Sequence, residues 1–182
     1  MIVLMVEDAR IVLRGEKFDV ERRDQPRRDG GVRQREVVVH PGAVTIVGEL
    51  DDGRIVMIRN QRFAVERTLL ELPAGTLESG EDPADCARRE LREETGYEAS
   101  IVEPLCVFFT SPGICTERMH AFVARGLKHV GQDLEPTERI EVEPMSLADV
   151  LRRCETQEIA DAKTLAALLY YARFAAGRSE RS

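Results

Sequence analysis

Short apolar runs, separated by turn residues, dominate the first two thirds of the chain and recur once more near residue 140. Asp29-Gly30-Gly31 and Asp51-Asp52-Gly53 punctuate these runs as turns do. The pattern predicts short extended segments at residues 2–6, 10–13, 16–22, 43–50, 54–60, 69–72, 99–102, 105–110, 118–124 and 140–144. No run approaches the roughly 18 apolar residues of a membrane span, so we expect no membrane partner.

A helical spacing appears first between Asp82 and Gly96. Asp82 suits the cap of a helix start, Pro83 suits its first position, and Gly96 can adopt the left-handed conformation that ends a helix. Between them a stripe of apolar residues, three to four apart, is formed by Ala84, Ala87 and Leu91. This stripe predicts a helix with one face against a core.

Two further helices are predicted late in the chain. Ser146 begins one that runs to about Cys154, and Asp161 begins another that runs to about Ala175. Many strands with one helix in the middle and two at the end indicate an α+β or mixed-sheet fold rather than repeated βαβ units. At 182 residues the chain is expected to form one domain with a small N-terminal appendage.

Three carboxylates crowd one side of the first predicted helix. At about 100° per residue, Glu90 and Glu94 lie on one strip and Glu93 lies beside it. Arg89 precedes Glu93 by four residues and can pair with it, which leaves Glu90 and Glu94 without a partner. A hard divalent cation such as Mg²⁺, which takes oxygen ligands, would compensate them. Taken alone, Arg-Glu-Leu-Arg-Glu-Glu would be interpreted as an exposed, solvated helix face.

The residues around this strip overturn that ordinary interpretation. Nine defined positions over 23 residues follow the pattern Gly75-x5-Glu81-x7-Arg89-Glu90-Leu91-x-Glu93-Glu94-x-Gly96-Tyr97. The pattern matches the Nudix box at every defined position, so the chain resembles Nudix hydrolases. The resemblance implies an α/β/α sandwich, with the box as loop–helix–loop, and cleavage of nucleoside diphosphates linked to another group with Mg²⁺ or Mn²⁺.

The resemblance also assigns roles to the residues of the box. Metal ligands would be Glu90, Glu93 and Glu94, together with the backbone carbonyl of Ala74. Glu81 would be a further acid near the metal, Arg89 would hold a glutamate in place, and Gly75 would let the loop turn tightly.

Phosphoryl chemistry requires a water aimed at phosphorus, and the resemblance implies that a glutamate in the loop before a late strand orients or deprotonates this water. Glu138 fits the family position best, Glu135 is second, and Glu93 of the box is third. The other interpretation of this segment is a plain acidic surface loop.

Flanking motifs indicate the branch of the family. The motifs, which resemble those of the ADP-ribose pyrophosphatase branch, are Glu71-Leu-Pro-Ala-Gly75, Ser111-Pro112-Gly113, Arg59-Asn-Gln-Arg62-Phe63 and Asp161-Ala-Lys163-Thr. The expected substrate contacts are Arg62, Arg59, Glu71, Pro112 and Gly113. Residues three apart in a strand point to opposite faces, so Arg59 and Arg62 need not reach one phosphate. The resemblance favours Arg62 as the phosphate or ribose contact.

The implied reaction is metal-dependent hydrolysis of ADP-ribose, or a similar ADP-sugar, to AMP and ribose 5-phosphate. Alternative substrates are another nucleoside diphosphate sugar, such as a GDP-sugar, or a damaged nucleoside triphosphate. A sensor that binds ADP-ribose without cleaving it is a third alternative. The intact Glu90, Glu93 and Glu94 speak against the sensor.

Three segments are expected: residues 1–35 as an N-terminal β-extension, 36–176 as the Nudix domain and 177–182 as a mobile tail. In relatives of this kind the extension swaps into a partner and builds a homodimer, with an adenine contact crossing between subunits. The alternative is a monomer whose extension folds back. A formal charge of −7 argues against a general nucleic-acid binder, and no export signal is apparent, so a cytoplasmic protein is expected.

Overall fold

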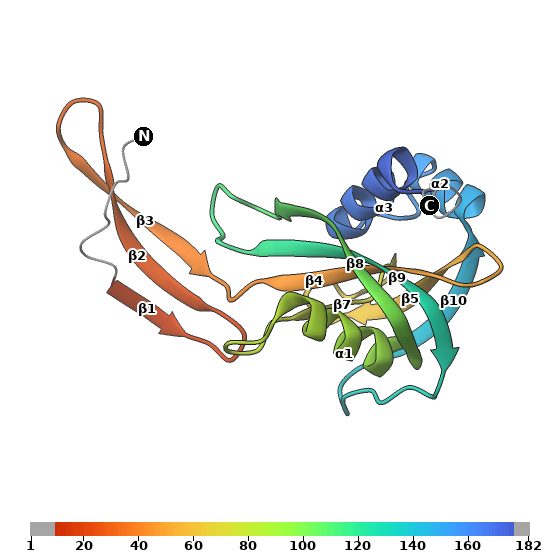
Figure 1. The fold of residues 1–182 in the computed structure, drawn as a ribbon. Coiled ribbons are helices and arrows are strands. Elements are labelled where there is room, and N and C mark those ends of the chain that lie inside the picture. The colour runs from red at the N-terminus through yellow and green to blue at the C-terminus, as the bar shows by residue number, and fades with distance from the viewer. Residues whose placement is uncertain (1–9, 177–182) are drawn as a thin grey trace.

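The computed structural model describes residues 10–176, which form two β-sheets and three α-helices (Figure 1). The predicted strand at 2–6 and the predicted mobile tail at 177–182 lie outside these residues. No helix of the described part is both long and apolar enough to cross a membrane.

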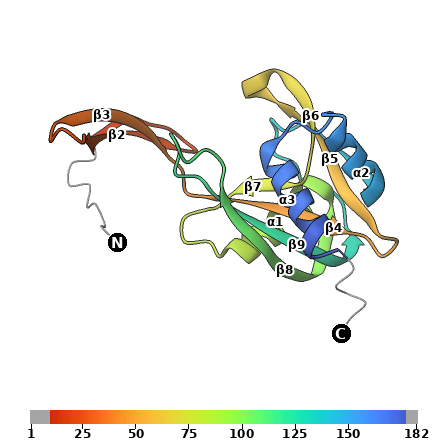
Figure 2. The ribbon, with the colours of Figure 1, turned by 90° about the horizontal axis from the view of Figure 1, so that it is seen from above.

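The smaller sheet is antiparallel and projects from the rest of the molecule (Figures 1 and 2). Its strands, in the order β1-β2-β3, are β1 (Arg10–Arg14), β2 (Asp19–Pro26) and β3 (Val32–Val39). It is joined to the larger part where Val38 donates to the Ile114 carbonyl (2.8 Å) and accepts from the Thr116 amide (2.9 Å). The predicted boundary between residues 35 and 36 falls within β3.

The larger sheet has seven strands and mixed pairing. Its main path is β10 (Ile140–Ser146), β5 (Arg54–Arg62), β4 (Ala43–Glu49), β9 (Arg118–His129) and β8 (Tyr97–Phe109). Strand β6 (Arg67–Glu71) pairs with β5, β7 (Ala74–Thr76) pairs with β4, and β4 is parallel to β9. The two segments predicted at 99–102 and 105–110 form the single strand β8, with an irregularity between Pro104 and Cys106.

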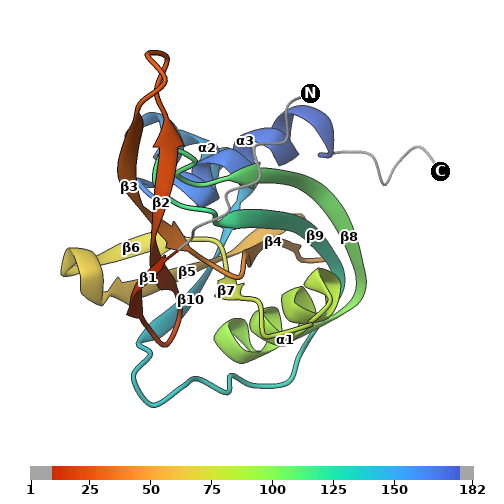
Figure 3. The same ribbon diagram turned by 90° about the vertical axis from the view of Figure 1, so that its left-hand side faces the viewer.

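Helices cover both faces of the larger sheet, and this confirms the predicted sandwich. Helix α1 (Pro83–Thr95) lies on one face, while α2 (Leu147–Glu155) and α3 (Ala162–Phe174) lie on the other (Figure 3). In the central strand β4, Val44 and Ile46 pack beneath α1, whereas Val47 packs towards α3. Both faces of this strand are therefore buried, which explains its continuous apolar run.

The helix ends follow the predicted capping. Asp82, Ser146 and Asp161 each accept a hydrogen bond from a backbone N–H in the first turn of α1, α2 and α3. Pro83 is the first residue of α1, and Gly96 ends it with φ 73°. Because these ends are set locally, the box helix begins and stops where its sequence indicates.

Candidate active site

Helix α1 presents its glutamates to a cavity of about 610 Å³, which we call the acidic cavity. Three segments form it: the β7 loop, the polar side of α1, and the loop that precedes β10. A turn of the small sheet completes the wall. Its charged lining residues are Glu16, Lys17, Arg62, Glu78, Arg89, Glu90, Glu93, Glu94, Glu135 and Glu138. Carboxylates outnumber cations here, so the cavity suits a bound cation more than a bare anion.

Glu94 is the most deeply buried acid of the acidic cavity, with 3% of its surface exposed. Its Oε2 accepts a hydrogen bond from the Ala74 amide at 2.8 Å, and no basic side chain of the described residues pairs with it. Burial raises the pKa of Glu94 to about 8, and the nearby Glu90 adds to this rise. Among residues 10–176, this carboxylate therefore forms no ion pair.

Glu90, in contrast, has a partner, and here the prediction was wrong. Arg89 Nη1 donates to Glu90 Oε1 at 2.7 Å and to Glu93 Oε2 at 3.2 Å. Arg89 Nε donates to Glu81 Oε1 at 2.9 Å, and Nη2 donates to Glu81 Oε2 and to the Thr76 carbonyl. One planar guanidinium with five N–H groups can serve three carboxylates, which spacing arguments for one pair overlook. Burial still raises the pKa of Glu90 despite Arg89.

Gly75 is needed for space and not for the tight turn that was predicted. It lies within the extended strand β7, and its φ is outside the left-handed region that favours glycine. A Cβ built at Gly75 would lie 1.8 Å from Glu90 Cδ. The absence of a side chain thus lets the Glu90 carboxylate lie against the loop.

The loop before β10 brings both candidate water-orienting glutamates to the acidic cavity. Glu138 Oε2 accepts a hydrogen bond from the Glu135 amide at 3.0 Å, and both residues line the cavity. The negative charge of Glu138 contributes to the raised pKa of Glu90 and of Glu94. Both loop glutamates therefore line the same cavity as the box glutamates of α1.

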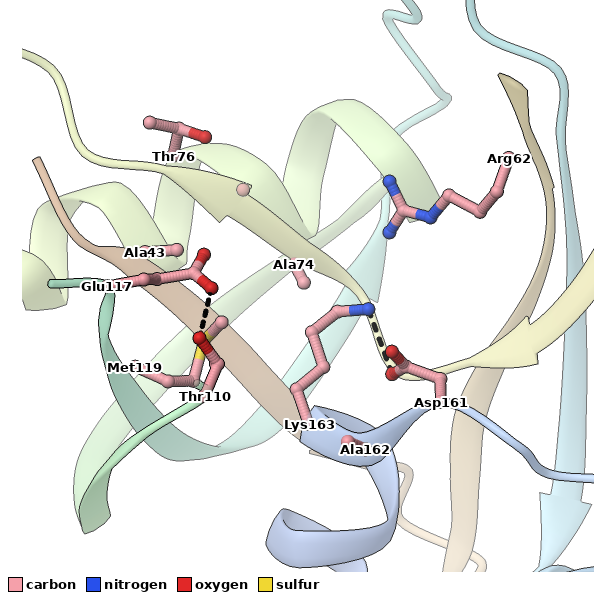
Figure 4. A pocket seen from close by; sticks show the side chains of 11 residues that line it. Ala43, Arg62, Ala74, Thr76, Thr110, Glu117, Met119, Asp161, Ala162 and Lys163 are labelled. Carbon is pink, nitrogen blue, oxygen red and sulfur yellow. Dashed lines mark hydrogen bonds and ion pairs between the residues drawn. The ribbon is translucent and has the colours of Figure 1, made fainter. Parts of the chain in front are cut away.

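A second, smaller cavity of about 320 Å³ adjoins the first, and we call it the side cavity. The two share Arg62, Ala74, Gly75 and Thr76. Figure 4 shows Arg62, Lys163 and Asp161 on one side of it, and Thr110 and Glu117 on the other. A ligand with two halves around a central phosphate group could therefore extend from one cavity into the next.

The predicted substrate contacts do not all meet at these cavities. Arg62 lines both, but Glu71, which is fully buried, lies behind it and binds it. Arg59 lines neither and instead pairs with Glu143 on β10, Nε to Oε2 at 2.6 Å. Pro112 and Gly113 are exposed and line neither cavity.

Several residues at the cavities were not predicted from the sequence. Glu16 and Lys17 come from the turn between β1 and β2, and nothing in their spacing linked them to the box. Lys163 stood in a flanking motif without an assigned role. Because each comes from a segment distant in sequence, only the fold could bring them to the site.

The donor set suits a divalent cation. Among residues 10–176, no three His, Cys, Asp or Glu side chains already converge as a metal site, and Arg89 holds Glu90 and Glu93. The available donors are nevertheless all oxygens, as Mg²⁺ prefers. Glu94 is buried without a counter-charge, and a cation would favour its charged form. The residues present therefore fit such an ion.

This loop–helix–loop, which holds carboxylates on a mixed sheet opposite Arg62, is the arrangement that the resemblance to Nudix hydrolases implied. The NUDIX domain family matches residues 39–168, and the chain belongs to this family. It is a Nudix pyrophosphohydrolase, as the box predicted.

Three proteins of known name are similar to this chain over most of its length. The chain is 40% identical over 161 residues to the ADP-ribose pyrophosphatase of Bacillus subtilis (strain 168), covering 87% of each chain. It is 40% identical over 152 residues to the ADP-ribose pyrophosphatase of Mycobacterium tuberculosis (strain ATCC 25618 / H37Rv), covering 81% of this chain and 73% of that one. A solved ADP compounds hydrolase superposes with a TM-score of 0.81 at 26% identity, covering 93% of this chain and 92% of that chain.

Proposed function

We propose that this enzyme hydrolyses the pyrophosphate bond of ADP-ribose, or of a similar ADP-sugar, to AMP and ribose 5-phosphate. The observation that carries the proposal is the junction of the acidic and side cavities at Arg62 and Gly75. A pyrophosphate at that junction would lie between the box glutamates and the arginine. The two ADP-ribose pyrophosphatases at 40% identity support the same substrate.

The metal ligands in this proposal are Glu90, Glu93, Glu94 and the Ala74 carbonyl, which would hold Mg²⁺ or Mn²⁺. Such a cation, when bound, neutralises charge on the phosphate oxygens. The protein's own part is to keep the carboxylates in place. Arg89, paired with Glu81, Glu90 and Glu93, positions two of them from the same helix.

Glu138 is proposed to orient the attacking water and take its proton. It lies on the loop that faces α1 across the acidic cavity, and a general base must come within hydrogen-bond reach of its proton. Glu135 is the second candidate and Glu93 the third. Arg62 is proposed as the phosphate contact, because it retains N–H groups beyond those bound to Glu71.

A homodimer is the proposed assembly. In β1 every residue is exposed, including Leu13 at 55%, and the outer edge of this strand has no neighbour in the described sheet. Residues 10–39 carry nine basic and six acidic side chains, whereas residues 40–176 carry 15 and 24. A basic, partly apolar sheet is thus complementary to the acidic body of a second copy.

The test is a substrate panel of ADP-ribose, GDP-mannose, NADH, diadenosine polyphosphates and 8-oxo-dGTP, each assayed with Mg²⁺ and with EDTA. The proposal expects the highest kcat/KM with ADP-ribose and no turnover in EDTA. A preference for GDP-mannose or 8-oxo-dGTP would assign the enzyme to another branch of the Nudix family. Tight ADP-ribose binding without turnover would favour the sensor.

A further inference from the structure

A closed ring of polar contacts lies behind Arg62, and we call it the Glu71 ring. Arg62 Nε and Nη2 donate to Glu71 Oε1 and Oε2 at 2.9 and 2.6 Å. Lys163 Nζ, from α3, also donates to Glu71 Oε2, at 2.6 Å. The ring therefore joins β5, β6 and the first turn of α3 at one carboxylate.

The ring closes through the cap of α3. Lys163 Nζ donates to Asp161 Oδ2 at 2.9 Å, and the Thr164 hydroxyl donates to the same oxygen at 2.5 Å. Thr164 Oγ1 in turn accepts from the Leu72 amide at 3.0 Å, next to Glu71 in the chain. Glu71, Lys163, Asp161 and Thr164 each have two partners, whereas Arg62 is held by Glu71 alone, through its Nε and Nη2 groups.

Burial gives the ring its rigidity. Glu71 has no exposed surface, while the Arg62 side chain is 37% exposed and lines both cavities. A buried carboxylate is strongly destabilising without counter-charges, so Glu71 requires both Arg62 and Lys163. Glu71 lines neither cavity, whereas Arg62 and Lys163 both line the side cavity.

We propose that Glu71 and Lys163 are positioning residues that hold the Arg62 guanidinium at the junction of the two cavities. The bidentate contact with Glu71 sets the plane of the guanidinium and leaves its Nη1 side for an anion. Lys163 shares the carboxylate and stops Glu71 from following Arg62 into the cavity. The inference rests on the proposed function, since it takes Arg62 as the phosphate contact.

The same strand supplies a matched control. Arg59 pairs with Glu143 at 2.6 Å from Nε to Oε2, but this pair lines neither cavity and the Glu143 side chain is 36% exposed. Glu71→Gln and Glu143→Gln thus remove the same charge from two arginine pairs, one beside the site and one away from it. Only the first should alter catalysis.

The experiment is a double-mutant cycle between Glu71→Gln and Arg62→Ala, with kcat/KM for ADP-ribose and thermal unfolding measured for every variant. Positioning predicts that Glu71→Gln lowers kcat/KM about tenfold and has almost no further effect once Arg62 is alanine. Glu143→Gln should match wild type. Equal losses from Glu71→Gln in both backgrounds would show that the residue acts on folding alone and would overturn the inference.

Lys163 gives a second route if Glu71→Gln does not fold. Lys163→Met should lower kcat/KM several-fold, and Lys163→Arg, which keeps the charge and donors, should restore most of it. Wild-type kcat/KM in Lys163→Met would also overturn the inference. If the wild-type enzyme does not hydrolyse ADP-ribose, the proposed substrate is wrong. The same double-mutant cycle is then measured with whichever substrate of the panel the enzyme cleaves.

Discussion

The small sheet and the sandwich differ in how far their apolar side chains are buried. In the sandwich, β4 is buried on both faces between α1 and α3. In the small sheet, β1 is exposed along its whole length, with Ile11, Val12 and Leu13 at the surface. The sandwich therefore has a buried core of its own, whereas β1 of the small sheet has no apolar cover among the described residues 10–176.

The two regions nevertheless meet at the site. The turn between β1 and β2 contributes Glu16 and Lys17 to the acidic cavity, although the sheet itself projects away (Figure 2). The box glutamates come from the sandwich alone. The comparison thus favours separate roles for the two regions. The sandwich would perform the chemistry, and the small sheet would complete the binding site and the proposed homodimer.

The proposal that the sandwich performs the chemistry requires that its box glutamates are essential for activity. Glu94→Gln and Glu90→Gln should each lower kcat at least about a hundredfold, because each removes a proposed metal ligand. Circular dichroism should show a folded protein. Wild-type activity of both variants, or full activity in EDTA, would sink the assignment.

Within the sandwich, the two loop glutamates can be separated by kinetics. Glu138→Gln should lower kcat by roughly ten- to a hundredfold with little change in KM, since a general base acts mainly in the transition state. Glu135→Gln is the matched control on the same loop. If Glu135→Gln causes the loss instead, the water-orienting residue is Glu135.

The proposal that the small sheet completes the binding site and the dimer requires that its removal affects both. Deleting residues 1–35 should abolish the dimer and raise KM for ADP-ribose about tenfold, while the remaining sandwich keeps measurable kcat. Leu13→Asp in the full chain should weaken the dimer alone. Light scattering at micromolar concentration measures the oligomeric state of both variants, and steady-state kinetics measures KM. A wild-type protein that is monomeric and fully active would contradict the proposed role of the small sheet.

The smallest expected effect concerns the stability of the box. The hydrogen bond from Arg89 lowers the pKa of Glu81 to about 2. A depressed folded-state pKa stabilises the fold above the unfolded value of about 4.5, and this stabilisation is lost as pH falls towards 2. Glu81→Gln should therefore lower Tm by a few degrees at pH 7, with the difference from wild type shrinking below pH 4.5. A constant difference between pH 7 and pH 3 would show that charge is not the cause.

Local features of the fold were readable from the sequence because their causes are local. Asp82, Ser146 and Asp161 cap helices with their own side chains, and β4 is buried along the apolar run that predicted it. The box glutamates share one strip because helix geometry places residues four apart together. Arg59 and Arg62 diverge, as their spacing in a strand indicated.

Contacts between distant segments were decided only by the tertiary structure. Glu71 meets Lys163 across 92 positions, and Lys17 reaches a cavity formed mostly by residues 62–138, neither of which periodicity can predict. Gly75 is required because Glu90 folds against it, and Arg89 serves three acids because the loop returns Glu81 to the helix. Sequence patterns therefore determined the elements and the family, whereas burial and the meeting of separate elements decided which charges are paired and which face the cavity.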